Sequence, residues 1–172
     1  MKKALEKFAA DILNGKYYGN TGSRKYIKQG GWYYITNGYA ILRLSEPIND
    51  YSLDNVVDPS WVEKIFNKYE KFDFLLADNS PTTDELRNGI KYVAGRKYGI
   101  NVVFNDEFLP ALNARILLAA MESLHAKNIY YGKENRYTSQ IYIFQDDDFS
   151  KSAFTLFPIV CDKENNPRFY EG

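Results

Sequence analysis

One order of patterns occurs twice in this sequence: a helical run of apolar residues, followed by three short β-rich runs. In residues 4–44 apolar residues recur at helical spacing through Leu5, Phe8 and Ile12, and RKYIKQ, GWYYIT and YAILRL follow. The second copy runs from ALNARILLAAMESLHA through NIYYG, TSQIYIFQDD and AFTLFPIV. The copies share element order but no convincing residue-by-residue identity. This order predicts an α+β fold in which a helix and three strands are repeated.

Glycine and asparagine divide these runs. Asn14-Gly15 is a stop signal for the first helix. Gly30-Gly31 and Asn37-Gly38 separate the β-rich runs that follow, which predicts a β-meander. We expect Asn37-Gly38 to form a two-residue type I′ turn, because Asn and Gly both tolerate the positive φ that this turn requires.

The middle of the chain, residues 45–100, differs from both copies and is predicted to be a helical insertion in a single domain, residues 1–172. Turn-forming residues fill SEPINDYSLDNVVDPS, and an Asp-Pro pair before WVEKIFNKYEKF indicates a capped helix. A second helix is expected from a cap at Thr82 or Thr83 to a stop at Gly99. The alternative for its later part is a hairpin formed by IKYVAGRKYGINVVF.

The composition narrows the classes of function. Lys plus Arg and Asp plus Glu each number 22, so the chain is formally neutral and lacks the bulk charge that favours nucleic-acid binding. The single cysteine, Cys161, cannot form an internal disulfide, which favours a cytoplasmic location. The N-terminus lacks the uninterrupted apolar core of a signal peptide, and no apolar run approaches roughly 20 residues. We therefore expect no membrane partner.

Catalytic and metal-binding patterns are sparse. His125, the only histidine, is expected to complete the C-terminal turn of the second helix rather than to act as a base. Cys161 follows an apolar run, which favours a half-buried structural thiol. Asp146, Asp147 and Asp148 could ligate Mg²⁺ or Ca²⁺, but adjacent aspartates point in different directions, which favours a solvated connection between strands. Neither a Walker-type loop nor a GxGxxG run occurs, so nucleotide binding has no support. Together with the interpretations of His125, Cys161 and the three aspartates, this leads us to expect no catalytic residue, metal or cofactor.

Tyrosines crowd the first β-rich region and permit two interpretations. With nearby basic residues they could stack against single-stranded nucleic acid. The alternation within YYIT and IYIF indicates instead a sheet with one packed face and one wet face. The residues concerned are Tyr17, Tyr18, Tyr26, Tyr33, Tyr34, Tyr39, Arg24, Lys25 and Lys28.

Two blocks of the sequence resemble a domain of the bacterial-type sliding clamp, the processivity factor of the replicative DNA polymerase. FNDEFLPALNARILLAAMESLHAKNIYY and DFSKSAFTLFPIV are similar to the end of that domain, where an F-N-A-x-Y-L helix precedes strands that finish in an apolar-Met-Pro-apolar motif. WYYITNGYAIL resembles the clamp hairpin with its Thr-Asp-Gly turn, here with Asn37. The sequence departs from the family at Ile116, where an aromatic residue is preferred, and at Phe157, which replaces Met. The resemblance covers residues 4–44 and 101–160.

The resemblance implies a DNA-clamp-like fold of two α-β-β-β units related by a pseudo-twofold, with their helices side by side and facing DNA. A ring of such domains can be neutral overall and still present basic residues on its inner helices. The candidate DNA-binding residues are Lys3, Lys7, Arg115 and Lys127, whose alternative role is that of ordinary solvated charges. A full clamp chain has three domains and closes by pairing sheet edges head to tail. This single domain would form a homo-oligomer or keep the fold without the ring.

Two functional hypotheses follow. The first is a non-enzymatic clamp-like module, of phage or mobile-element origin, that associates with itself, with replication proteins or with DNA. The second is a small α+β enzyme or ligand-binding protein whose site lies in the middle segment, around Trp61, Asp78, Asp84 and Glu85. A metal or ligand bound to the purified protein would favour the second hypothesis.

Overall fold

The computed structural model describes residues 1–17, 21–67, 74–77, 81–87, 92–95, 99–102, 112–132 and 140–157. Within these ranges it shows an α+β fold with an antiparallel sheet, as the sequence predicts. The helices are α1 (Lys3–Leu13), α2 (Ser60–Asn67), α3 (Thr83–Arg87) and α4 (Ala114–Ser123). The strands are β1 (Lys25–Gln29), β2 (Trp32–Thr36), β3 (Ala40–Leu44), β4 (Phe74–Leu76), β5 (Tyr92–Gly95), β6 (Gly99–Val102), β7 (Leu112–Asn113), β8 (Tyr130–Gly132), β9 (Ile141–Phe144) and β10 (Ala153–Leu156).

The larger sheet brings the two repeated sets of elements together. Its seven strands lie in the order β1-β2-β3-β10-β9-β8-β4, and β5-β6-β7 form a second sheet. α1 precedes β1 to β3, and α4 precedes β8 to β10. The two sets meet where β3 pairs antiparallel with β10, so β10-β9-β8 repeats β1-β2-β3 in reverse across the sheet.

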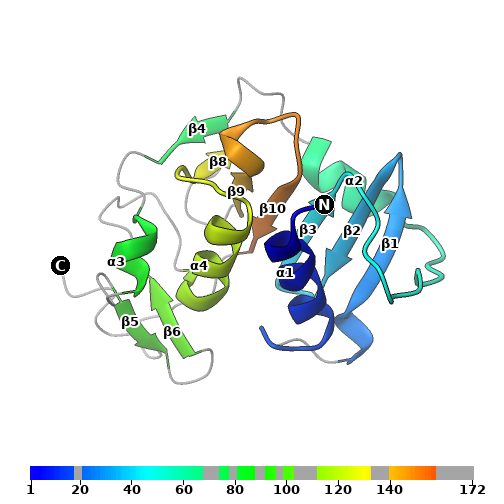
Figure 1. Ribbon diagram of the computed structural model, residues 1–172, viewed down its shortest axis with the longest axis horizontal. Helices are drawn as coiled ribbons and strands as arrows, with labels where there is room; N and C mark the ends of the chain where they lie inside the picture. The colour runs from blue at the N-terminus through cyan, green and yellow to red at the C-terminus, as the bar shows by residue number, and fades with distance from the viewer. Residues whose placement is uncertain are drawn as a thin grey trace.

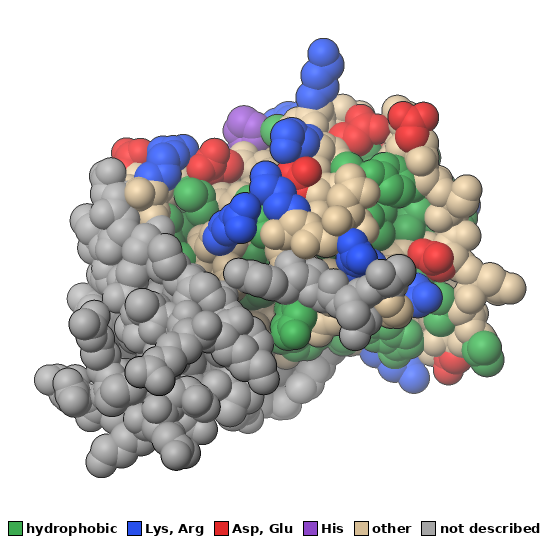
Figure 2. Space-filling view, turned by 90° about the horizontal axis from the view of Figure 1, so that it is seen from below, with side chains coloured by type: hydrophobic (Ala, Val, Ile, Leu, Met, Phe, Trp, Pro, Cys, Tyr) green, Lys and Arg blue, Asp and Glu red, His purple; other side chains and the backbone are tan. Residues whose placement is uncertain are grey.

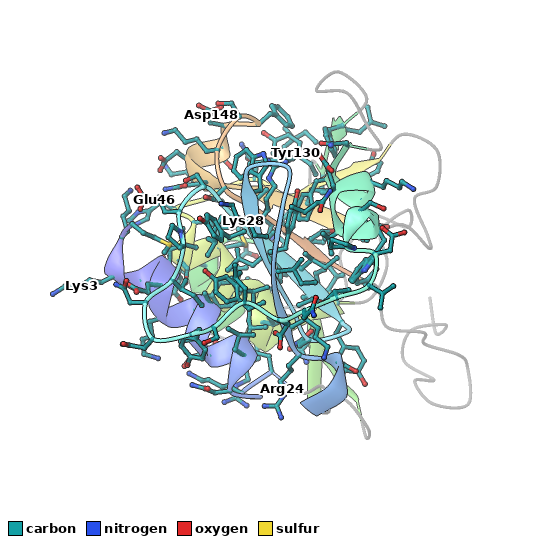
Figure 3. The ribbon with its side chains drawn as sticks, turned by 90° about the vertical axis from the view of Figure 1, so that its right-hand side faces the viewer. Lys3, Arg24, Lys28, Glu46, Tyr130 and Asp148 are labelled. Atoms are coloured by element: carbon teal, nitrogen blue, oxygen red, sulfur yellow. The ribbon has the colours of Figure 1, made fainter. Side chains whose placement is uncertain are left out.

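Helices cover the larger sheet on both faces. α1 and α4 lie on one face and α2 on the other, as the front and side views show (Figures 1 and 3). Along β3, Ala40, Leu42 and Leu44 belong to the core under α1 and α4, whereas Ile41 belongs to the core under α2. Every residue of β3 is buried because helices cover both faces of the sheet at this strand.

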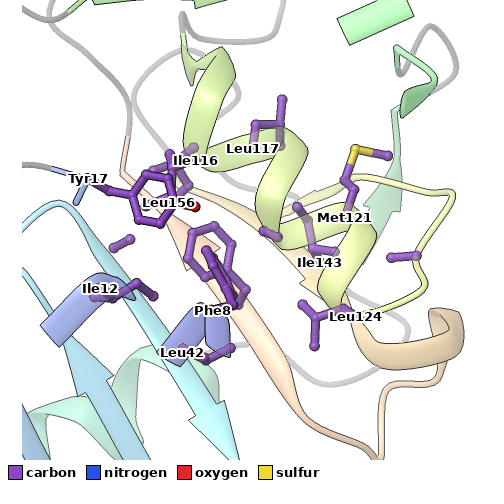
Figure 4. Close-up of a cluster of buried hydrophobic side chains, with 14 of the residues drawn as sticks. Phe8, Ile12, Tyr17, Leu42, Ile116, Leu117, Met121, Leu124, Ile143 and Leu156 are labelled. Carbon is purple, nitrogen blue, oxygen red and sulfur yellow. The ribbon is translucent and has the colours of Figure 1, made fainter. Parts of the chain in front are cut away.

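The larger hydrophobic core lies between the helix pair and the sheet (Figure 4). Leu5, Phe8 and Ile12 bury one face of α1, as their helical spacing predicts. α4 buries more of its circumference and exposes little besides Arg115 and Glu122. Its apolar face is therefore fixed against the sheet, and its few polar residues face outward.

α1 and α4 run antiparallel to each other. The Arg115 guanidinium, in the first turn of α4, lies 6.0 Å from the ring centroid of Tyr17, just beyond the end of α1. At the opposite end, the Asp146 amide donates to the carbonyl of Leu124, which follows α4, and the Asp146 carboxylate interacts with the charge of Lys2. The start of each helix therefore lies beside the end of the other.

Both helices end in the same backbone motif, with a residue of positive φ after the C-cap. In α1 this residue is Gly15 (φ 84°), and the amides of Gly15 and Lys16 donate to Ile12 and Asp11. In α4 it is His125 (φ 50°), and the amides of His125 and Ala126 donate to Glu122 and Met121. These two paired bonds define a Schellman motif. The expectation that His125 completes a helix C-terminal turn is confirmed.

Replacement of His125 by glycine is expected to raise the free energy of unfolding by about 1 kcal/mol, because glycine adopts positive φ without the Cβ penalty. Urea denaturation at a fixed temperature measures the change. Gly15→Ala is the matched opposite test: its φ is +84° and a Cβ would overlap the Arg24 guanidinium, so we expect a loss of about 1–2 kcal/mol. If the two substitutions changed the free energy of unfolding by the same amount in the same direction, this account of the helix ends would be contradicted.

The turns of the first hairpins differ from expectation. Gly30 and Gly31 both have positive φ (58° and 83°) and join Gln29 to Trp32, as a primed two-residue turn requires. At the next turn only Gly38 has positive φ, so the type I′ turn expected at Asn37-Gly38 is wrong. Asn37 acts through its side chain, whose Oδ1 accepts hydrogen bonds from the amides two and three residues later.

The middle segment is only partly helical. α2 follows a cap in which Asp58 Oδ1 accepts from the Ser60 amide. α3 begins with a reciprocal capping box between Thr82 and Glu85, but it ends at Arg87. The helix expected to reach Gly99 is therefore wrong. The hairpin alternative is confirmed, because β5 and β6 pair antiparallel. The segment also supplies β4, which extends the larger sheet beside β8.

Candidate nucleic-acid interface on the helix face

The outer surface of α1 and α4 carries three of the four predicted DNA-binding residues. Lys3 and Lys7 lie on the exposed side of α1, and Arg115 lies on the exposed side of α4. Lys3 projects away from the body of the protein (Figure 3). Lys127 follows α4 and is also exposed. The helical spacing of the buried residues places these cations outward.

Lys7 differs from the other candidates because its charge is paired. Lys7 Nζ lies 2.9 Å from Asp11 Oδ2, and Lys16 Nζ lies 3.4 Å from the same oxygen. Burial alone would raise the pKa of Asp11, but the hydrogen bond from Lys7 and the charge of Lys16 outweigh it and hold this pKa below its usual value. In the part of the chain that the structure describes, Lys3, Arg115 and Lys127 make no ion pair.

One end of the helix pair gathers cations around the ring of Tyr17. Lys16 Nζ lies 5.7 Å and Arg115 Cζ 6.0 Å from the ring centroid. Arg24 Nη1 donates to the carbonyl of Leu13 at 3.3 Å, which ties β1 to the end of α1. We call Lys16, Tyr17 and Arg115 the Tyr17 cluster. Lys16 was not among the predicted residues, although its place after the helix stop could have indicated it.

Asn113 sets the position of Arg115. Its side-chain oxygen accepts from the amides of Arg115 (3.0 Å) and Ile116 (3.1 Å), so Asn113 is the N-cap of α4.

Burial raises the pKa of the Tyr17 hydroxyl, and the neighbouring charge of Arg115 acts against this rise. Tyr17 therefore stays neutral and serves as an apolar platform beside two cations.

The other end of the helix pair is mixed in charge. Asp147 accepts from the backbone amides of Lys127 (3.2 Å) and Asn128 (3.1 Å), and Asp146 Oδ2 lies 2.9 Å from Lys151 Nζ. The hydrogen bond from Lys151 lowers the pKa of Asp146. These carboxylates therefore bind amides and a lysine. No group of three His, Cys, Asp or Glu side chains suited to a metal ion occurs among the described residues.

Acidic and basic side chains are mixed on the described surface (Figure 2). Figure 2 shows basic side chains interspersed with acidic, apolar and uncharged ones over the described part of one face. Arg87, beside α4, contributes to this mixture because it lies 2.8 Å from Asp84 Oδ1 and 3.1 Å from Glu122 Oε1. Asp11 of α1 and Glu122 of α4 lie beside cations, so the helix face carries negative as well as positive charge.

The opposite face of β3 holds a buried cation. Arg43 is 7% exposed, and its guanidinium lies 4.2 Å from the Trp32 ring centroid and 5.0 Å from that of Phe66. Arg43 Nη2 donates to the carbonyl of Lys151 at 3.0 Å. Burial lowers the pKa of Arg43, and burial also raises the pKa of Tyr34 to about 12. Arg43 is a structural charge on aromatic rings and is not available to an external anion.

Most of the described tyrosines in the first sheet belong to the core. Tyr17, Tyr26 and Tyr34 are buried, Tyr33 is half-buried, and Tyr39 is exposed. The interpretation of one packed face and one wet face is wrong, because Tyr34, Tyr142 and Phe144 are buried in the core on the face that α2 covers. The buried rings of Tyr17, Tyr26 and Tyr34 are not open to stack on nucleic acid. Tyr18 lies outside the described residues.

The residues of the alternative site do not converge. Trp61 lies on α2, whose Val62 packs in the core on one face of the sheet. Asp84 and Glu85 lie on α3, whose Leu86 packs in the core on the other face. Asp78 lies outside the described residues, as do Cys161 and the Pro-Ile-Val end of the clamp-like motif. The layered fold therefore separates Trp61 from the acidic pair.

Comparison with known proteins adds no relative. The sequence matches no protein-family model, and no curated protein matches it. Across the described ranges, no helix has the length and apolar character needed to cross a membrane.

Proposed function

We propose that this chain is a non-enzymatic, DNA-clamp-like module that lies against duplex DNA through its α1–α4 face, by itself or with replication proteins. One observation carries the proposal. α1 and α4 lie antiparallel on one face of a sheet in which the strands that follow each helix are arranged symmetrically about the β3–β10 pair. This is the arrangement that two α-β-β-β units of a clamp would adopt.

The charges on this face support weak, salt-dependent binding. Arg115, Lys3 and Lys127 are exposed and make no ion pair within the described residues, whereas Lys7 is paired with Asp11. Each cation that neutralises a phosphate releases condensed counterions, with a slope of about −0.9 in log affinity against log salt. Three contacts from one copy predict a slope of roughly −2 to −3. Several copies on one duplex would add their contacts.

Arg115→Glu is expected to weaken binding of a fluorescently labelled DNA duplex by about tenfold at low salt, because a phosphate contact becomes a repulsion. Fluorescence anisotropy titrations at several salt concentrations measure both affinity and slope. The substitution is compatible with folding, since a carboxylate in the first turn of α4 is favoured by the helix dipole.

Lys64→Glu is the matched control, because Lys64 is an exposed helical residue on α2 and the substitution changes net charge by the same amount. We expect its affinity for DNA to stay within about twofold of the unmodified protein. An equal loss of DNA affinity in both variants would show that only net charge matters and would refute the proposed interface. Failure of the unmodified protein to bind the duplex at low salt would also refute it.

The alternative of a small enzyme or ligand-binding protein is not favoured by the geometry. Trp61 and Asp84 lie on opposite faces of the larger sheet. Asp84 and Glu85 are engaged locally, with Arg87 and with the amide of Thr82. No specific observation supports a shared site for these residues.

A further inference from the structure

The outer edge of β1 is occupied by one residue of the same chain. β1 ends the larger sheet on one side and pairs with β2 on the other. The Tyr26 amide donates to Asp54 Oδ2 at 2.7 Å, and the Asp54 amide donates to the Tyr26 carbonyl at 2.7 Å. Both outward backbone groups of Tyr26 are therefore taken. The segment that leads from Glu46 to α2 crosses this edge (Figure 3).

At Tyr26, Asp54 makes the two hydrogen bonds that a neighbouring strand would make. Its carboxylate accepts from the Tyr26 amide, as a strand carbonyl would, and its own amide donates to the Tyr26 carbonyl. Leu53 and Val57 on the same segment are exposed, at 48% and 105%, whereas Val56 packs against the core under α2. Before Asp54 the segment is held by hydrogen bonds, in which the Ile48 amide donates to the Tyr26 hydroxyl and the Tyr51 hydroxyl donates to Asn14 Oδ1.

β1 is complementary to a second β1 in one antiparallel register. In an antiparallel pair the backbone groups of alternate residues point to the same side, so those of Lys28 point outward like those of Tyr26. A pairing centred on Ile27 places Tyr26 of one copy opposite Lys28 of the other, and Lys25 opposite Gln29. No like charges then meet across the pair. Without Asp54, the outward backbone groups of β1 would be free to pair with a strand of another chain.

We propose that Asp54 closes the β1 edge against strand addition by a second copy of this chain, and that two copies pair through β1 when Asp54 is removed. The contact is isologous, since the same strand serves in both copies. It involves neither α1 nor α4, so it does not rest on DNA binding. The edge is a latent interaction surface whose partner is the same strand.

Asp54→Ala tests the proposal in the full chain. Light scattering across a range of protein concentrations should show that its mass rises above that of the unmodified protein, toward twice that value. In dilute solution, hydrogen exchange of the Tyr26 amide should be about tenfold faster, because a hydrogen bond to a carboxylate is lost. Asn55→Ala is the matched control, because Asn55 is exposed on the same segment, and its mass and exchange rate should be unchanged.

A second substitution shows which surface associates. Lys28→Pro removes an outward amide of β1, so Asp54→Ala combined with Lys28→Pro should return to the mass of the unmodified protein. Circular dichroism establishes that each variant is folded.

If Asp54→Ala does not fold, Asp54→Asn keeps one acceptor oxygen and should give a smaller increase in mass and in Tyr26 exchange. Unchanged mass and exchange in the folded Asp54 variant, or association that persists with Lys28→Pro, would overturn the proposal. DNA affinity should not change in Asp54→Ala, so failure here is distinct from failure of the proposed interface.

Discussion

Phe154→Ala is expected to lower the free energy of unfolding by about 3–5 kcal/mol. Phe154 is fully buried in β10 and lies opposite Leu42 of β3 and Ile143 of β9. Its ring centroid lies 5.5 Å from that of Phe8 on α1. The substitution would open a cavity where the two sets of strands meet beneath the helix pair. A loss of this size is a large part of the stability of an ordinary domain.

Urea denaturation followed by circular dichroism measures this change. Phe149→Ala is the matched control, because Phe149 is the same residue type but only half-buried, against Phe74 and Phe144 on the other side of the sheet. We expect it to cost less than half as much free energy, since less apolar surface is lost. If both variants lose the same free energy, or Phe154→Ala loses under 1 kcal/mol, the β3–β10 junction is not the centre of the fold.

The elements that the sequence predicts well are those whose signal is local. The spacing of Leu5, Phe8 and Ile12 fixes the buried face of α1, and the three β-rich runs after it become β1, β2 and β3. The repeated order of a helix and three strands is likewise visible in the sequence. Each of these signals lies within a few neighbouring residues, and tertiary packing reinforces it.

The features that the sequence does not predict depend on distant partners. β4 joins the larger sheet because Leu75 pairs with Tyr131, a contact that no local pattern encodes. α3 stops at Arg87 although its cap is correctly indicated, because the residues from Tyr92 onward pair as a hairpin. The turn at Asn37-Gly38 is not type I′, because Asn37 does not adopt positive φ. Its buried side chain instead accepts hydrogen bonds from the amides of Tyr39 and Ala40.

The residues of the candidate interface also divide into those that the sequence predicts and those that depend on distant partners. Helical periodicity places Lys3, Lys7 and Arg115 on the outer surface, and the i, i+4 spacing to Asp11 could have indicated that Lys7 is paired. The meeting of Arg115 with Lys16 at Tyr17 depends on the antiparallel packing of two helices far apart in the sequence. Side-chain clusters of this kind follow only from the tertiary fold.

The closed β1 edge bears on how copies of this chain could assemble. A head-to-tail ring needs a free strand at each end of the sheet, and Asp54 occupies both outward backbone groups of Tyr26 at one end. Ring closure through β1 would therefore require the segment containing Asp54 to move. As the chain stands, the proposed module meets DNA as a single domain or assembles through another surface.

Asn37→Ala is expected to lower the free energy of unfolding by about 2–4 kcal/mol. Asn37 is fully buried, and its Oδ1 accepts from the amides of Tyr39 (2.9 Å) and Ala40 (3.0 Å). Its Nδ2 donates to the carbonyl of Tyr17 at 3.1 Å. The Tyr39 side chain is exposed, so water can reach this part of the turn, whereas the groups at Ala40 and Tyr17 lose their partner in a buried setting.

The second effect of Asn37→Ala concerns the Tyr17 cluster. Because Asn37 ties the β2–β3 turn to the backbone of Tyr17, its loss should loosen the platform that lies between Lys16 and Arg115. Urea denaturation gives the free energy of unfolding, and anisotropy under folding conditions gives the DNA affinity, which should fall with it. Asn55→Ala, at an exposed asparagine, should change the free energy by no more than about 0.5 kcal/mol. A loss below 1 kcal/mol for Asn37→Ala would mean that the turn re-forms without this side chain, and that Tyr17 is held by its ring packing on Phe8 instead.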